Sequence, residues 1–172
     1  MKAAGGAHAD RDRWLELSDE ALLRECRREA YQASGPGGQK RNRVYSAVRL
    51  THGPSGIAVT AAEHRSAQRN LAAALHRLRR RIALEIRPAG DARPAPGGLP
   101  DLRLSPANPR HPRLLATVAD ALHANGFQAA DAARALGLST GQLVRLLARD
   151  TEAWQHVNRQ RLDRGLAPLR DR

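Results

Sequence analysis

The residues most suited to chemistry lie in the segment SGPGGQKRN, Ser34 to Asn42. Gly37 and Gly38 precede Gln39, and positive charges follow directly. Glycine tolerates backbone conformations that other residues avoid, and it lets a backbone approach a ligand closely. A GGQ tripeptide taken alone is most often part of an ordinary connecting loop. The rest of the chain must therefore show whether this loop has a function.

The charge of the chain predicts a polyanionic partner. The 172 residues include 29 Lys and Arg against 17 Asp and Glu, a net charge of +12. Residues 31–87 carry 11 basic and 2 acidic side chains, so the GGQ segment opens the most cationic stretch. Such an excess is the electrostatic signature of a nucleic-acid binder. Aromatic residues make up only 3% of the chain, which argues against a platform that stacks single-stranded bases.

The elements that must position this segment can be predicted from the residue pattern. Ser18 starts a capped helix, whereas residues 25–33 fit a helix or a strand equally well. Residues 44–60 predict a hairpin, with Val44, Ser46, Val48 and Leu50 on one face and a turn at Gly53–Gly56. Ser66 caps a helix to about Ile86. Its apolar stripe consists of Leu71, Leu75, Leu78, Ile82 and Ile86.

Proline and glycine divide the chain. Residues 88–112 hold seven of the ten prolines and predict an extended linker. We expect a domain that contains the GGQ segment at 14–87, a helical domain at 113–165, and flexible ends at 1–13 and 166–172. The predicted fold class is α+β: a small sheet packed on a long helix with an exposed GGQ loop, then a small all-α domain.

Several classes of site are disfavoured. Cys26 is the single cysteine, so the chain cannot form an internal disulfide or a zinc site built from cysteines. His52 and His64 have no acidic or thiol neighbours at ligand spacing, and we expect neither metal nor cofactor. No apolar run is long enough for a membrane span, so we expect a cytoplasmic protein without a membrane partner.

The context of the GGQ segment resembles the catalytic domain of class I peptide chain release factors. The matching residues follow in the family's order: SGPGGQ, Asn42, the run from Ser46 to His52, Pro54 to Ile57, Arg65-Ser66 and Asn70. The same domain occurs in stand-alone ribosome-rescue peptidyl-tRNA hydrolases. The resemblance covers about residues 25–87. Ala67 stands where the family usually has Gln, which weakens any detailed inference at that point.

The resemblance implies a ribosome-dependent hydrolase that acts on the peptidyl-tRNA ester. Gly37, Gly38 and Gln39 would be the catalytic tripeptide, inserted beside the large-subunit rRNA and the P-site peptidyl-tRNA. In the family the backbone N–H of the residue matching Gln39 stabilises the negative charge that develops during attack by water. That glutamine is also commonly N-methylated, so a Gln methyltransferase is a further candidate partner.

The expected RNA contacts are the cations around the loop and along the helix. An exposed, solvated face is the alternative interpretation, but the single sign of most of the charge favours phosphate contact. Asn42 is expected to stabilise the loop more than to take part in chemistry. The predicted RNA-binding set is Lys40, Arg41, Asn42, Arg43, Arg49, Arg65, Arg69, Arg77, Arg80 and Arg81.

The flanking regions favour a rescue factor over a codon-reading one, although the Ala/Leu-rich helical unit after the linker departs from the Lys/Arg-rich tail of the rescue hydrolases that the chain resembles. About thirty residues precede the loop, which is too few for a stop-codon-reading domain of the release-factor type, so we expect release without a stop codon. Residues after the linker resemble a helix-turn-helix, with Gly137 in the turn and Thr140, Gln142 and Arg145 facing a groove. The alternatives for this unit are a plain packing module or, as a whole-protein function, a non-catalytic RNA- or DNA-binding regulator.

Overall fold

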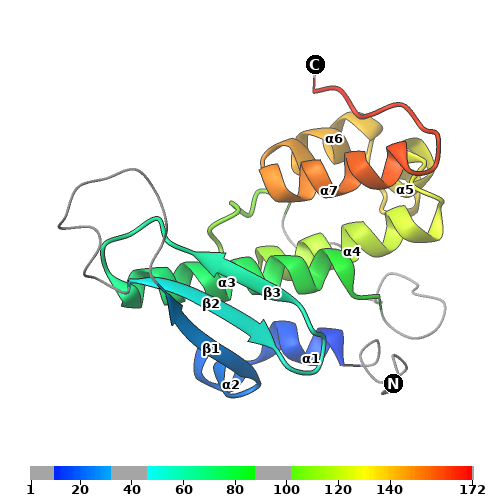
Figure 1. Cartoon of the computed structure of the whole chain (residues 1–172). Helices are drawn as coiled ribbons and strands as arrows, with labels where there is room; N and C mark the ends of the chain where they lie inside the picture. Colours follow the sequence, from blue (N-terminus) through cyan, green and yellow to red (C-terminus); the bar gives the residue numbers. More distant parts are fainter. Residues whose placement is uncertain (1–9, 32–45, 88–101, 172) are drawn as a thin grey trace. The chain divides into compact units, whose positions relative to one another are not determined.

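The computed structural model describes residues 10–31, 46–87 and 102–171. The chain divides into two compact units, Met1–Ile82 and Ala83–Arg172. Figure 1 shows the helices and strands in sequence order. The first unit combines a sheet with helices and the second is helical, so each is described by itself.

The first unit contains a three-stranded antiparallel sheet with the order β1-β2-β3. Arg49, in the middle strand, lies opposite Glu29 on one side and Thr60 on the other, which sets the register. The strands are β1 (Cys26–Tyr31), β2 (Ala47–His52) and β3 (Ala58–Ala61).

The predicted hairpin over 44–60 is confirmed in its described part. Its turn at Gly53–Gly56 ends on Gly56 with φ of 71°, in the left-handed region that favours glycine. The second strand begins one residue later than expected, at Ala58. The undecided segment 25–33 contains strand β1 rather than a continued helix.

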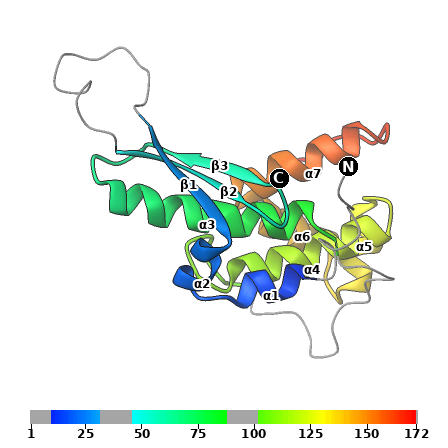
Figure 2. The ribbon, with the colours of Figure 1, turned by 60° about the horizontal axis from the view of Figure 1, so that its bottom comes forward.

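The sheet packs on the long helix α3 (Ala67–Glu85), as Figure 2 shows. Ser66 caps this helix as predicted, because its Oγ accepts a hydrogen bond from the Arg69 N–H at 3.3 Å. The central part of the predicted stripe is buried, whereas its two ends are only half-buried. The unit's core includes Val48, Leu50 and Val59 from the sheet and Leu75, Leu78 and Ile82 from α3.

Two short helices, α1 (Arg11–Glu16) and α2 (Asp19–Arg24), precede the sheet. Ser18 caps α2 as predicted, since its Oγ accepts from the Ala21 N–H at 3.2 Å. Trp14 and Leu22 are fully buried and complete the core of this unit.

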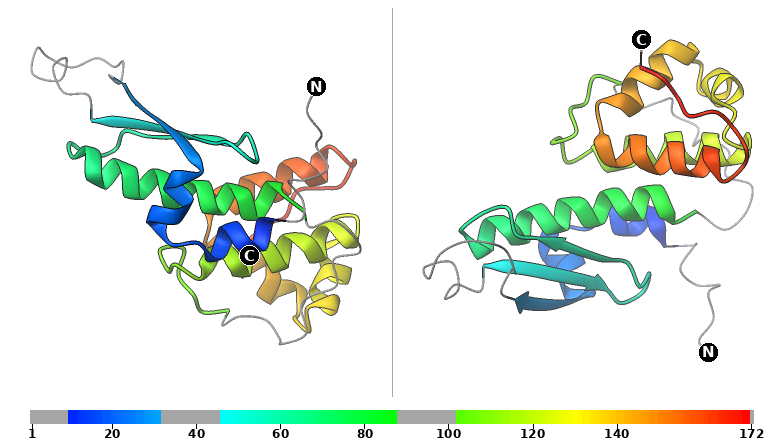
Figure 3. Two further views of the ribbon diagram at one scale, coloured as in Figure 1. Left: turned by 90° about the horizontal axis from the view of Figure 1, so that it is seen from below. Right: turned by 45° about the horizontal axis from the view of Figure 1, so that its top comes forward.

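The second unit is helical. Its helix α4 is buried along most of its length, and each helix packs against the next one in sequence. Figure 3 shows them from two further directions. The helices are α4 (His111–Ala124), α5 (Ala129–Ala135), α6 (Thr140–Ala148) and α7 (Thr151–Leu162).

The connection between α5 and α6 is short, and each backbone N–H from Leu136 to Ser139 donates a hydrogen bond. Gly137 has φ of 69°, and the Leu138 N–H donates to the Ala133 carbonyl at 2.8 Å, which closes the end of α5. Ser139 then caps α6 by a reciprocal capping box with Gln142. These bonds fix the point at which the chain turns from one helix into the next.

A buried polar pair ties the first helix of this unit to the last. His111 Nε2 lies 3.0 Å from Asp150 Oδ2, and both side chains are almost completely buried. Asp150 also caps α7, because its Oδ1 accepts from the Ala153 N–H at 3.0 Å. A second carboxylate, Asp120, pairs with Arg87 and is also buried.

Among the residues that the structure describes, no helix combines the length and apolar character that a membrane crossing needs.

Candidate functional site

The expected catalytic tripeptide belongs to the connection between β1 and β2. The structure describes the chain as far as Tyr31 at the end of β1 and again from Ser46, just before β2. Gly37, Gly38, Gln39, Lys40, Arg41, Asn42 and Arg43 all lie outside the described residues. What the structure does describe is how the returning end of this connection is held.

Asn70 holds that end. Its side chain is fully buried, and its Nδ2 donates to the Ser46 carbonyl at 2.7 Å and to the His64 carbonyl at 2.8 Å. Its Oδ1 accepts from the His64 N–H at 2.9 Å. One amide thereby joins the first turn of α3, the segment before it and the start of β2. The sequence marked Asn70 only as part of the resemblance, and this anchoring role was missed.

Two of the predicted RNA-binding arginines contact the sheet. The His52 N–H donates to the Ile57 carbonyl, so the alternation of an antiparallel pair turns the carbonyls of Ala58 and Thr60 to the outer edge of β3. Arg81 donates to the Ala58 carbonyl at 3.2 Å. Arg77 donates to the Thr60 carbonyl and pairs with Glu63. These arginines supply donors to an edge that would otherwise be open.

The other predicted cations are placed differently. Arg65 and Arg69 are exposed, and neither forms an ion pair within the described ranges. Arg49 is exposed on the open face of the sheet, where it lies 3.9 Å from Glu29. Arg80 is half-buried on α3. The exposed cations therefore lie on the open face of the sheet (Arg49), just before α3 (Arg65) and in the first turn of α3 (Arg69).

Sequence reasoning missed two further cations, Arg27 and Arg28, both exposed on β1. Arg27 pairs with Glu29 at 2.6 Å and keeps 75% of its side-chain surface exposed. The sequence did not indicate these two cations because residues 25–33 fitted a helix and a strand equally well. Only in a strand does this segment lie beside Arg49 of β2.

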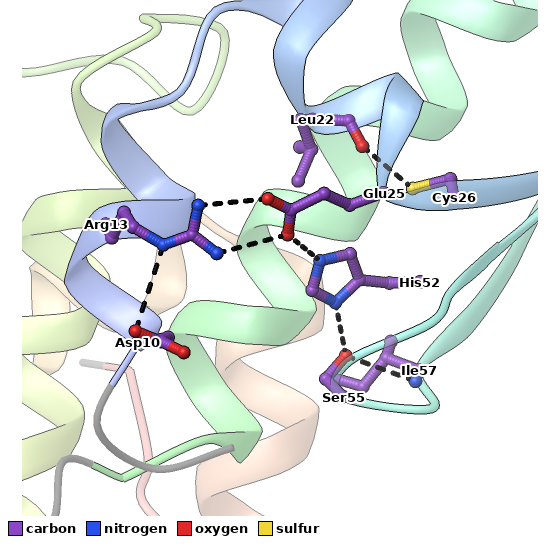
Figure 4. Close-up of polar contacts among 8 residues, drawn as sticks. All are labelled: Asp10, Arg13, Leu22, Glu25, Cys26, His52, Ser55 and Ile57. Carbon is purple, nitrogen blue, oxygen red and sulfur yellow. Dashed lines mark hydrogen bonds and ion pairs between the residues drawn. The ribbon is translucent and has the colours of Figure 1, made fainter. Parts of the chain in front are cut away.

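A chain of polar contacts closes the opposite end of the sheet (Figure 4). Arg13 pairs with Glu25 at 3.0 Å, and Glu25 Oε2 lies 3.4 Å from His52 Nε2. His52 Nδ1 lies 2.8 Å from Ser55 Oγ, which also accepts from the Ile57 N–H at 3.3 Å. The edge of Trp14 meets the His52 ring at a centroid distance of 4.8 Å.

The contacts among Ser55, His52 and Glu25 stabilise the fold and do not form a nucleophilic site. His52 is fully buried, so no substrate reaches its ring. The Ser55 hydroxyl is committed to the Ile57 amide as well as to the imidazole. The network lies where β2 ends, whereas the GGQ connection joins the strand at its start. Its effect is to hold α1, the start of β1 and the β2–β3 turn together.

Cys26, which follows Glu25 of this network, is not a nucleophile either. Burial raises the pKa of the Cys26 thiol to about 11, and its Sγ lies 3.2 Å from the Leu22 carbonyl, so this thiol is unreactive at neutral pH. Within the described ranges, no three His, Cys, Asp or Glu side chains are grouped so as to hold a metal ion.

We expect the stability of the first unit to fall below about pH 6.5 because of His52. Burial lowers the pKa of His52 below its ordinary value of 6.5, against the opposing influence of Glu25, while Arg13 lowers it further. As pH falls, the unfolded chain takes up the proton first, so acid favours unfolding. In His52→Gln, the denaturant midpoints of unfolding at pH 7.5 and at about pH 5.5 should therefore lie closer together than in the wild type. His64→Gln, at an exposed position of the same unit, is the control, and an unchanged pH dependence in His52→Gln would contradict the assignment.

The three residues expected to face a groove lie at and after the start of α6. Thr140 and Arg145 are exposed. Gln142 is exposed too, but its Oε1 accepts the Ser139 N–H at 2.8 Å in the capping box. The amide oxygen of Gln142 is therefore used within the helix end.

Comparison with known proteins identifies the first unit. Residues 20–94 match the RF-1 domain, the GGQ domain of class I release factors, which includes α2, the whole sheet, α3 and the GGQ segment. Residues 20–94 are an RF-1 domain. The resemblance inferred from the sequence is thus confirmed, with bounds that extend a few residues beyond 25–87 on each side. The Asn70 contacts and the arginine-covered edge of β3 lie within this RF-1 domain.

The curated relatives of the RF-1 domain are much longer proteins. Peptide chain release factor 1 of Amoebophilus asiaticus is 45% identical over 67 residues, 39% of this chain and 19% of the relative. Peptide chain release factor 2 of Paramagnetospirillum magneticum is 52% identical over 58 residues, 34% of this chain and 16% of the relative. Peptide chain release factor 2 of Mycobacterium bovis is 46% identical over 90 residues, 49% of this chain and 24% of the relative. No solved structure matches the chain.

The comparisons limit how much of the chain the RF-1 domain accounts for. The chain spans between 16% and 24% of the length of the three relatives, and residues 95–172 lie outside the domain match. The helical unit from α4 to α7 is therefore not accounted for by the family.

Proposed function

We propose that this chain hydrolyses the ester between a nascent peptide and its tRNA on the ribosome. The observation that carries the proposal is the RF-1 domain over residues 20–94, together with the GGQ tripeptide inside it. Gly37, Gly38 and Gln39 are the proposed catalytic residues. The partners are the large-subunit rRNA and the P-site peptidyl-tRNA, and the reaction takes place in the cytoplasm without a cofactor.

The proposed chemistry needs a hydrogen-bond donor and no acidic or thiol side chain. Water attacks the ester carbonyl carbon, the bond to the ribose oxygen breaks, and the ribose oxygen leaves as a hydroxyl while the peptide becomes a carboxylic acid. Negative charge develops on the carbonyl and ribose oxygens. The backbone N–H of Gln39 stabilises this charge, and the two glycines let the backbone approach it. The Gln39 side chain admits water and excludes larger nucleophiles, and it is the proposed target of a Gln methyltransferase.

The cations have divided roles in this proposal. Lys40, Arg41 and Arg43 contact RNA phosphates beside the tripeptide, and Asn42 stabilises the loop. Exposure favours Arg49, Arg65 and Arg69 as further phosphate contacts, with Arg27 and Arg28 added to them. Arg77 and Arg81 contribute mainly by holding β3, since their guanidinium groups bind its outer carbonyls. Arg80 remains a candidate contact on α3.

We propose further that release does not require a stop codon, as in ribosome-rescue hydrolases. This part rests on the sequence resemblance to those hydrolases. We also propose the domain organisation expected from the sequence, namely a GGQ-containing unit over 14–87, a proline-rich linker over 88–112 and a helical domain over 113–165. The last two residues of this linker already belong to α4.

The second unit supports a second candidate function. We propose that α5, the Gly137 turn and α6 form a helix-turn-helix, because the turn is short and both flanking helix ends are closed by local hydrogen bonds. The alternative whole-protein function is then a non-catalytic RNA- or DNA-binding regulator, with the RF-1 domain as a docking module.

Peptide release from purified ribosome complexes tests the first proposal. One set carries mRNA truncated at the decoding site, and the other carries a stop codon followed by intact message. We expect release on the truncated complexes, reduced in Gln39→Ala while ribosome binding persists. Release on the stop-codon complexes alone would overturn the rescue assignment. Tight binding without release on either set would favour the regulator.

A further inference from the structure

We infer that the exposed stripe formed by Gly141 and Arg145 of α6 and by Arg149, the C-cap residue of this helix, is a phosphate-binding surface for double-helical RNA of the ribosome. The inference deepens the proposed function and rests on it for the choice of ribosomal RNA. It gives the second unit a task that the RF-1 domain does not assign, namely to hold the chain on the ribosome without reading sequence.

The spacing of the stripe places its members on one face. Gly141, Arg145 and Arg149 are four residues apart and all exposed, and such positions lie above one another on a helix. The opposite face of α6 is buried through Leu143, Leu146 and Leu147. Glycine in the stripe lets the first turn of the helix approach a ligand closely. The stripe therefore faces away from the unit's own core.

The charge of the stripe is uniform. Helix α6 (Thr140–Ala148) contains no acidic residue. Arg145 forms no ion pair in the described part of the chain, and Arg149 makes only a long contact of 3.4 Å to the Leu102 carbonyl. Two guanidinium groups on one face match adjacent phosphates, with which arginine can pair in a bidentate manner.

The surrounding surface is more cationic than the sequence implies. Residues 102–171 hold ten arginines and six carboxylates. Two of the six carboxylates, Asp120 and Asp150, are buried, the first against Arg87 and the second against His111. Glu152 is half-buried, so the exposed side chains of this range comprise eight arginines and three carboxylates, which favours a polyanion as the occupant.

The same helix is poor in side chains that read bases. Gln142, which could pair with adenine, has its amide oxygen committed to the Ser139 N–H. No aromatic residue lies on α6 to stack on a base. Thr140 and Arg145 alone are too few for sequence readout. A surface of this kind binds backbone phosphates rather than base edges, and the most abundant phosphate backbone beside an RF-1 domain on the ribosome is rRNA.

Equilibrium binding of the full chain tests the inference. The double variant Arg145→Gln/Arg149→Gln is compared with the wild type on purified ribosomes, on an RNA duplex of about 20 base pairs and on a DNA duplex of the same length. Arg170→Gln, an exposed arginine outside α6, is the matched control. The slope of log affinity against log salt should fall by about 1 for each of these two arginines removed, on ribosomes and on the RNA duplex.

Release activity is measured in the same variants. The maximal release rate at saturating protein should be unchanged, because α6 is outside the RF-1 domain, while half-saturation should move to higher protein concentration. If the double variant binds ribosomes and RNA like the control, the inference is overturned even where release is seen. Tighter, sequence-selective binding to DNA would also overturn it. If the wild type releases no peptide but its ribosome binding still depends on Arg145 and Arg149, the inference stands and the proposed function fails.

Discussion

Gln39→Pro is expected to lower the rate of peptide release by about 10²–10³-fold, more than Gln39→Ala does, because proline removes a backbone N–H that alanine keeps. The proposed mechanism assigns the stabilisation of the developing oxyanion to the backbone of Gln39 and the selection of water to its side chain. Alanine therefore loses one of these contributions and proline loses both. The order of the two variants separates the two contributions.

The measurement is single-turnover release from preformed ribosome complexes at saturating protein. Arg41→Pro controls for the stiffness that a second proline brings to the same segment, since no role in catalysis is assigned to its N–H. Ribosome affinity is measured separately for each variant. Equal rates for Gln39→Ala and Gln39→Pro would show that the backbone N–H of Gln39 does not stabilise the transition state.

Asn70→Leu is expected to destabilise the first unit by about 3 kcal/mol or more. The substitution keeps the number and branching of the side-chain heavy atoms but leaves the Ser46 carbonyl, the His64 carbonyl and the His64 N–H without the partner that they have in the folded chain. A typical intramolecular hydrogen bond contributes about 0.5–1.5 kcal/mol, and a group that stays shielded from water after losing its partner costs about 1–3 kcal/mol. Release should fall as well, because Ser46 is where the chain returns from the GGQ segment to the sheet.

Unfolding of the first unit can be followed separately from that of the second. In a Trp154→Phe background the fluorescence comes from Trp14 alone, which is fully buried in the first unit. Gln68→Ala, at an exposed position of α3, is the control, with an expected change within about 0.5 kcal/mol. A loss below 1 kcal/mol in Asn70→Leu would mean that the three backbone groups find other partners.

Helices α2 and α3 were predictable because local pattern determines them, whereas α1 was not predicted. The stripe of α3 and the caps at Ser18 and Ser66 are encoded within a few residues, and the structure confirms all three. Strand β1 was not predictable in the same way. Its sequence CRREAY lacks an apolar alternation, since it is an edge strand whose stability comes from pairing with β2.

The roles of single side chains were harder to predict than the elements. Arg77 and Arg81 fitted a phosphate-binding face in the sequence, because nothing there shows that β3 is an edge strand whose carbonyls need donors. Asn70 contacts a carbonyl 24 residues away, which only the fold brings near. Gln142 is different: Ser139 and Gln142 form the S-x-x-Q pattern of a capping box, so its use at the helix end could have been inferred.

The pair between His111 and Asp150 has a consequence for how the second unit is made. The two residues are 39 positions apart, so the ring at the start of α4 meets its carboxylate only after α5 and α6 have been synthesised. Until then a ring that belongs in the interior has only solvent or the emerging chain to contact. During translation the core of this unit therefore cannot be completed before Asp150, at the start of α7, has left the ribosomal tunnel.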